Sequence, residues 1–157
     1  MAAQTGRTSA KFIKVLLDNA AGALTDISAY VSSIGTVGLT YDTVDVTAFS
    51  DGVKNVAIGQ PGASLQFSGP VDTVIITQLT GYTANGGLTA GGGLSLDIRF
   101  GIRHAWEAGE PQFGITGSAS VGYLLTGFTI DSGGMTWTAT FGVMGATAPA
   151  FGTAAES

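Results

Sequence analysis

The chain has 157 residues and a formal net charge of −5 at pH 7. Hydrophobic residues make up 45% of it and charged residues only 11%, against about 25% charged residues in ordinary soluble domains. Such a chain either lies in a membrane or buries much of its surface against copies of itself. The six Lys and Arg residues are scattered along the sequence and predict no basic face for nucleic acid, and the absence of cysteine excludes disulfides and thiol chemistry.

No segment has the pattern of a membrane helix or of a secretion signal. The two charge-free windows, 111–130 and 132–155, are rich in Gly, Thr and Ser and hold no continuous apolar run of about twenty residues. Near the N-terminus, Asp18 ends a short apolar run. We therefore expect no membrane partner, and three segments: an N-terminal arm at 1–10, a single β domain at 11–145 and a C-terminal tail at 146–157.

The first third of the chain contains short alternating segments. Lys11–Asp18 places Ile13, Val15 and Leu17 on one face, which predicts the first strand. Leu24–Ile34 is ambiguous, because its apolar residues fit helical spacing while its Ser and β-branched residues favour a short turn or a pair of strands.

A long connector follows between two further alternating segments, Tyr41–Phe49 and Ala63–Phe67. The connector, Ser50–Gly62, has thirteen residues, far more than the two to five that close an economical hairpin. Three of its residues are apolar and need a surface on which to lie. They are Val53, Val56 and Ile58.

The next segment leaves helix and strand open. Pro70 and Asp72 suit a helix start with Asp72 as N-cap, so that Thr73–Thr80 would be helical. The β-branched residues of the same segment favour a strand. Gly81–Gly93 contains many glycines and is predicted to be a loop.

The longest alternation runs over Leu94–Glu107 and predicts a strand. Its apolar residues share one face and its charged residues share the other, as an outward charge ladder. The ladder is either a solvated face with modest ion pairs or a set of contacts across a subunit boundary. It consists of Asp97, Arg99, Arg103 and Glu107.

The last third predicts a hairpin. Gly122–Ile130 and Met135–Met144 alternate, and Asp131–Gly134 between them is a strong turn signal. On the second strand the apolar residues, Trp137 among them, are predicted to face inward.

No pattern predicts catalysis or a cofactor. His104 is the one histidine, no G-x-S-x-G motif is present, and the residue is expected to be structural. Asp42, Asp45 and Asp51 lack EF-hand spacing, so no metal is expected. The run Gly91–Gly93 precedes a strand and lacks the Lys-Ser/Thr of a phosphate loop. We accordingly expect a protein that is not an enzyme and binds no cofactor.

Residues 40–69 contain three phrases in sequence: DTVDVTAF at the end of a strand, a long loop that contains Lys54 and closes on IGQPG, and the short strand phrase LQFSG. This series of phrases resembles the major tail tube proteins of long-tailed bacteriophages. The resemblance extends over roughly residues 10–145. In that family the long loop reaches out of the subunit and stacks on the neighbouring ring. The loop residues that it implies as contacts are Asp51, Val53, Lys54, Val56, Ile58, Gln60 and Pro61.

The resemblance also implies a fold and a function. It favours a helix at 73–80, so the expected fold is β-rich α+β: an antiparallel β-sandwich or partly open barrel with one short helix and a long inter-strand loop. Subunits would form six-membered rings that stack into a hollow tube, with other phage tail proteins, in a virion tail assembled in the host cytoplasm. Phage DNA would pass through the lumen without specific binding, because like charges repel.

An alternative from another class stays open on the sequence alone. A carbohydrate- or surface-binding β-sandwich, such as an adhesin or a virion decoration module, would share the composition and the strand pattern. It would be a soluble monomer or small oligomer with exposed aromatic residues.

Overall fold

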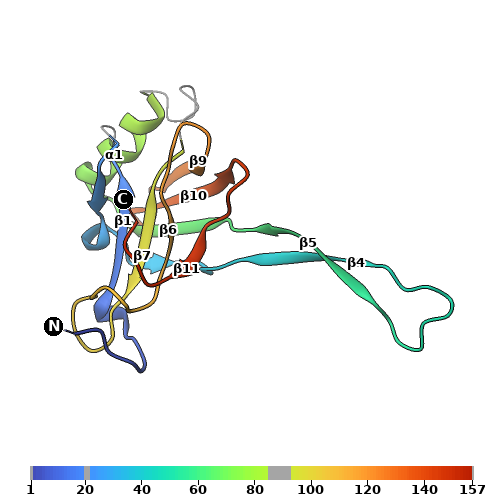
Figure 1. Ribbon diagram of the computed structural model, residues 1–157. Helices are drawn as coiled ribbons and strands as arrows, with labels where there is room; N and C mark the ends of the chain where they lie inside the picture. Colours follow the sequence, from blue (N-terminus) through green and yellow to red (C-terminus); the bar gives the residue numbers. More distant parts are fainter. Residues whose placement is uncertain (1, 20–21, 85–92, 157) are drawn as a thin grey trace.

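The computed structural model describes residues 2–19, 22–84 and 93–156 and consists of a β-sandwich body and one long arm (Figure 1). All pairings between its strands are antiparallel, and the body contains one α-helix among the described residues. The expected β-rich α+β sandwich is thereby confirmed, and the two sheets of the body do not close into a barrel.

The first sheet of the body has five strands. In β7 apolar and polar residues alternate, and in β1 Ile13, Val15 and Leu17 share one face, because alternate side chains of a strand point to opposite faces. Lys14 lies directly opposite Arg99 in the register of these two strands. In spatial order the strands are β11 (Ala150–Gly152), β8 (Gln112–Ile115), β7 (Leu96–Phe100), β1 (Ile13–Asp18) and β2 (Leu24–Asp26).

The second sheet has four strands, and its two long members are joined by the tight turn that the sequence predicts at Asp131–Gly134. Asp131 Oδ1 accepts a hydrogen bond of 3.0 Å from the backbone N–H of Gly133, which stabilises that turn. In spatial order the strands are β3 (Ser33–Ile34), β6 (Leu65–Pro70), β10 (Thr136–Met144) and β9 (Gly122–Asp131).

One hydrophobic core lies between the two sheets. Trp137 and Phe141 of β10 and Phe67 of β6 pack in it against Phe113 of β8 and Leu17 of β1, and each is at most 1% exposed. The inward orientation predicted for Trp137 is confirmed, because its side chain is fully buried. Burial of large side chains at this density supplies most of the driving force for folding.

The α-helix α1 (Thr73–Ala84) lies at one end of the sandwich (Figure 1). Asp72 caps it as predicted, since Asp72 Oδ1 accepts a 2.7 Å hydrogen bond from the N–H of Val74. Ile75 and Leu79 enter the core. The helix is longer than predicted and includes the first residues of the expected glycine-rich loop, whose residues 85–92 lie outside the described part of the chain.

The segment that was ambiguous in the sequence contains strands and a short helical turn. It divides into β2, the 3-10 turn η2 (Ser28–Tyr30) and β3. A second 3-10 turn, η1 (Ala10–Phe12), occupies the first residues of the predicted strand Lys11–Asp18, so that β1 begins at Ile13.

The strand predicted over Leu94–Glu107 ends early, at Phe100. The N–H of Gly101 donates to the carbonyl of Phe12 at 3.1 Å, and Arg103 has a positive φ of 63°. A left-handed residue cannot continue a strand, so the chain turns here and the alternation beyond Phe100 does not reflect strand geometry. His104 and Trp106 therefore lie in a loop and not on the apolar face of a strand.

Both terminal segments contact the body. Within the stretch expected as a C-terminal tail, β11 pairs with β8, and the N–H of Glu156 donates to buried Asp97 at 3.1 Å. At the other end of the chain, the N–H of Gln4 donates to Glu110 at 3.0 Å and the hydroxyl of Thr8 donates to a body carbonyl at 2.6 Å.

Candidate assembly surface

The most unusual feature of the molecule is the arm, which we define as residues 40–62. It is a two-stranded antiparallel ribbon of β4 (Thr40–Asp45) and β5 (Val56–Gly62) that extends far from the sandwich (Figure 1). No other strand pairs with either of its members among the described residues. An isolated two-stranded hairpin is at best marginally stable in water, so this ribbon needs a partner.

The arm carries most of the exposed large hydrophobic side chains. Seven of the twelve found in the described residues belong to it. Ile58 and Val53 are 71% and 72% exposed, and the ring of Phe49 at the tip contacts nothing that shields it. Exposed apolar surface on this scale marks an interaction site in soluble proteins. The other four are Tyr41, Val44, Val46 and Val56.

Both faces of the ribbon are apolar. Thr43 lies opposite Ile58, and Val44 lies opposite Ala57. Because directly paired residues share a face and successive residues alternate, Ile58 and Val44 point to opposite sides. A ribbon of this kind buries its apolar side chains only when partners cover both of its sides.

The tip of the arm is ordered by its own side chains. Asp51 Oδ2 accepts hydrogen bonds of 2.8 Å from the N–H of Ala48 and from the side-chain amide of Asn55. The N–H of Asn55 in turn donates to the hydroxyl of Thr47 at 2.8 Å. This network closes the turn with little help from the rest of the molecule, and Phe49 follows directly after Ala48 of the network.

The two tip carboxylates are held in the ionised form. The side chain and the backbone N–H of Thr47 lower the pKa of Asp45. The N–H of Ala48 and the amide of Asn55 lower the pKa of Asp51. Lys54 lies 3.9 Å from Asp45, so the tip carries net negative charge at neutral pH.

The structure corrects the predicted loop in one respect. The connector expected over Ser50–Gly62 is a turn only in its first part, and Val56–Gly62 is the strand β5, which pairs with β4. Ala63–Phe67, the alternating segment predicted after the connector, leads into β6 of the second sheet. The sequence does not predict β5, because the segment contains Gly59 and Pro61 and both residue types are depleted in strands.

The seven residues that the resemblance implies as contacts all lie in the arm, and all are exposed. Three of them belong to the turn and four to β5. They are Asp51, Val53 and Lys54 in the turn, and Val56, Ile58, Gln60 and Pro61 in β5.

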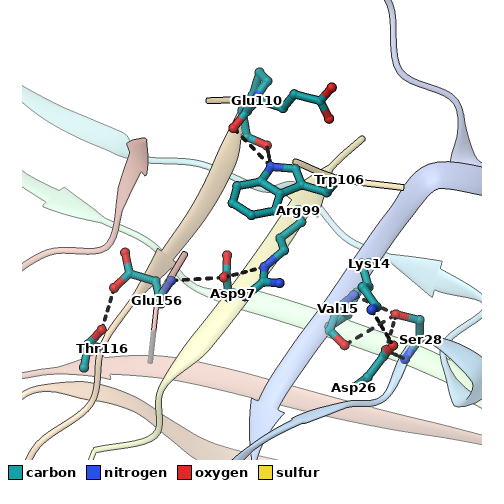
Figure 2. A network of polar contacts seen from close by, with 11 residues as sticks. Lys14, Val15, Asp26, Ser28, Asp97, Arg99, Trp106, Glu110, Thr116 and Glu156 are labelled. Atoms are coloured by element: carbon teal, nitrogen blue, oxygen red, sulfur yellow. Dashed lines mark hydrogen bonds and ion pairs between the residues drawn. The ribbon is translucent and has the colours of Figure 1, made fainter. Parts of the chain in front are cut away.

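The predicted outward charge ladder is not formed. Asp97 is fully buried on the outer face of β7, because the C-terminal segment covers it. Arg99 donates from Nε to Asp97 at 2.8 Å, and its side chain is only 18% exposed (Figure 2). Arg103 and Glu107 lie beyond the end of β7 in the loop. Single-sequence alternation could not reveal a covering segment that is about sixty residues away along the chain.

The cationic residues are less scattered than their sequence positions suggest. Lys14 and Arg99 face each other across β1 and β7, and Lys11 lies in the turn η1 just before β1. Residues 6–8 contact the loop 101–103 through the hydroxyl of Thr8 and the carbonyl of Gly101. Five of the six Lys and Arg residues thus gather at one end of the body: Arg7, Lys11, Lys14, Arg99 and Arg103.

His104 belongs to a buried polar cluster around Glu110. Its Nε2 atom lies 3.1 Å from Glu110 Oε1. Burial alone would raise the pKa of Glu110, but N–H donors from Gln4, Glu107 and Ile102, together with His104, hold it below its ordinary value. The cluster fastens the N-terminal segment and the loop to each other, and contains no nucleophile beside the histidine.

The described residues contain no group of three or more His, Cys, Asp or Glu side chains placed to hold a metal ion. Within the same part of the chain, no helix is long and apolar enough to cross a membrane.

Comparison with known proteins does not place the chain in a family. No protein-family model matches it, and no curated protein matches it in sequence.

Proposed function

We propose that this protein is a self-assembling structural subunit, and more specifically a subunit of the tail tube of a long-tailed bacteriophage. In this proposal hexameric rings of the chain stack into a hollow conduit within the virion tail. Other tail proteins bind the ends of the tube, and phage DNA passes through it without specific binding. The proposed role is structural and involves no catalysis.

The arm is the observation that carries the proposal. Its apolar side chains lie on both faces of an unsupported ribbon, and no part of the described body covers them. A monomer in water gains nothing from this arrangement, whereas a subunit that inserts the arm between neighbours buries it. The low charged fraction of 11% also suits a chain whose surface is extensively covered by copies of itself.

The net negative charge of the chain supports the proposal that DNA passes through the tube. With a net charge of −5, the chain has too few cations to neutralise a long row of phosphates. A lumen lined by such subunits would let DNA slide, because like charges suppress adhesion.

The test replaces two apolar arm residues by charged ones, Val56→Asp and Ile58→Asp. We expect wild-type protein to form stacked rings or tubes with a central channel in negative-stain electron microscopy. The double variant should remain as dispersed particles whose circular dichroism matches the wild type, because the substitutions touch no residue of the core.

The matched control adds the same charge at exposed positions of the body, Thr129→Asp and Thr147→Asp. This control should assemble as the wild type does. Normal tubes from the arm variant would remove the arm from the assembly mechanism. Dispersed wild-type particles at every concentration, together with binding in a glycan screen, would favour the carbohydrate-binding alternative.

A further inference from the structure

The body contains a surface hollow of about 360 Å3 at the end where the cationic residues gather. Residues of η1, β1, β2, η2, β7 and the loop after β7 line it. Its cations are Lys11, Lys14 and Arg99, and Phe12, Ile13 and Trp106 supply an apolar and aromatic lining. We call this site the socket.

Two cations of the socket, Lys14 and Arg99, are held in place by contacts with neighbouring side chains (Figure 2). Arg99 is fixed between Asp97, at 2.8 Å, and the ring of Trp106, whose centroid lies 4.8 Å from the guanidinium carbon. Trp106 Nε1 donates to the carbonyls of Glu110 and Pro111, each at 3.1 Å. A site that is ordered before binding loses little conformational entropy when it binds.

Lys14 is fixed in a similar way on the neighbouring strand. Its Nζ atom lies 3.3 Å from Asp26 Oδ2, and Ser28 donates to the other oxygen of the same carboxylate at 2.6 Å (Figure 2). Asp26 lines the socket beside Lys14, and Asp97 lies behind Arg99. Together with these two carboxylates, the three cations give the socket a formal charge of +1, in a chain whose net charge is −5.

The arm has the opposite character. Three Asp residues and one Lys give residues 40–62 a formal charge of −2. At the tip an exposed aromatic ring, Phe49, is flanked by the ionised carboxylates of Asp45 and Asp51. An aromatic anchor with charged neighbours matches an aromatic hollow with cations of opposite sign, and aromatic anchors in pockets dominate binding energies at interfaces.

The two surfaces cannot meet within one molecule. In Figure 1 the arm leaves the body on one side, while the N-terminal segment and the loop after β7 lie on the other. A contact between them must therefore join two copies head to tail. Contacts of this heterologous kind repeat from copy to copy, which is what a growing stack requires.

We propose that the socket receives the arm tip of a second copy of this chain, with Phe49 inserted among Phe12, Ile13 and Trp106. The tip carboxylates then face Lys11 and Lys14. This inference rests on the proposed function, because it identifies the surface on which the arm of one subunit docks in the next.

Cross-linking through introduced cysteines tests the contact, since the chain has no cysteine of its own. The variant Ala48→Cys/Ala105→Cys places one thiol beside Phe49 and one at the rim of the socket, both at exposed positions. A short bis-maleimide should give a ladder of multimers on a denaturing gel. The matched control, Ala48→Cys/Thr129→Cys, has its second thiol at an exposed position near the end of β9 and should give none.

A third variant measures the role of the aromatic ring. Adding Phe49→Ala to the Ala48→Cys/Ala105→Cys pair should weaken association roughly 30-fold, as truncation of an interface hot spot does. Lys11→Glu/Lys14→Glu should also reduce the ladder, because the charges of socket and tip would then repel.

Electron microscopy of the same samples separates this inference from the proposed function. Tubes without a ladder from Ala48→Cys/Ala105→Cys would overturn the socket and leave the tube proposal standing. A ladder equally strong with the Thr129→Cys control would also overturn it. A ladder without tubes would support the socket and contradict the tube, and dispersed particles without any ladder would overturn both.

Discussion

The body and the arm use the same kinds of side chain in opposite ways. In the body, β-branched and aromatic residues lie between two sheets, and residues such as Trp137 and Phe113 are completely buried. In the arm, the same residue types are exposed on both faces of a ribbon, and none of residues 40–62 is buried. The body thus provides stability, whereas the arm has its own strand pairing and tip hydrogen bonds but no core that buries its apolar side chains.

This difference separates the residues that matter for folding from those that matter for assembly. Substitutions in the body should change the free energy of unfolding, and substitutions in the arm should leave it almost unchanged. Stability is best measured in the Val56→Asp/Ile58→Asp protein, which we expect not to assemble, because association would otherwise add to the apparent stability.

The largest difference in the effect of a substitution on stability is expected between the centre of the core and the strands of the arm. Trp137→Ala should destabilise the protein by about 3–5 kcal/mol, because it removes a fully buried aromatic side chain. Val44→Ala in the arm should change stability by less than about 0.5 kcal/mol. Urea unfolding midpoints would measure both, and similar costs for the two variants would contradict a division between body and arm.

A second contrast uses two glycines. A Cβ added to Gly114 of β8 would collide with the carbonyl oxygen of Leu96 in the neighbouring strand, whereas a Cβ at Gly52 in the arm turn would meet nothing within 4 Å. We expect Gly114→Ala to cost about 1–3 kcal/mol and Gly52→Ala to be close to neutral. Thermal unfolding followed by circular dichroism would compare them, and a costly Gly52→Ala would show that the turn is packed.

The smallest expected effect concerns pH and the N-terminal segment. The pKa of Glu110 lies below its ordinary value of 4.5 in the folded protein. Its contribution to stability is therefore present above that value and is lost as the pH falls through the lower, folded-state pKa. The arm has no comparable buried carboxylate, since all three of its Asp residues are exposed.

Glu110→Gln isolates this contribution from the other carboxylates. Wild-type protein should lose more thermal stability than Glu110→Gln between neutral pH and about pH 3, because only the wild type loses this charge. Differential scanning calorimetry at several pH values would measure the change in Tm. Parallel curves for the two proteins would show that Glu110 does not fasten the N-terminal segment through its charge.

The sequence predicts the body better than the arm. Alternation over Val15 and Leu17, the turn at Asp131–Gly134 and the N-cap at Asp72 are local signals, and the structure confirms each of them. These features can be predicted from sequence because each depends on residues that are only a few positions apart.

Two other features depend on partners outside the few neighbouring residues that a local pattern covers. Asp97 has the spacing of an exposed residue, but a segment near Glu156 covers it. The strand β5 contains Gly59 and Pro61, which local propensity assigns to a loop, and it is a strand because β4 lies beside it. The apolar character of Val53, Val56 and Ile58 nevertheless indicated from sequence that the connector needed a surface.

The arm begins and ends at one point of the body, since Thr40 and Gly62 are paired neighbours. Its length can therefore change without any change in the sandwich. If two residues were added to each of its strands, the arm would become about 7 Å longer, because that is the rise of two residues. The existing side chains would remain on the same faces. A single added residue would reverse the faces. In a stack of such subunits, the length of the arm would determine the distance from one copy to the next.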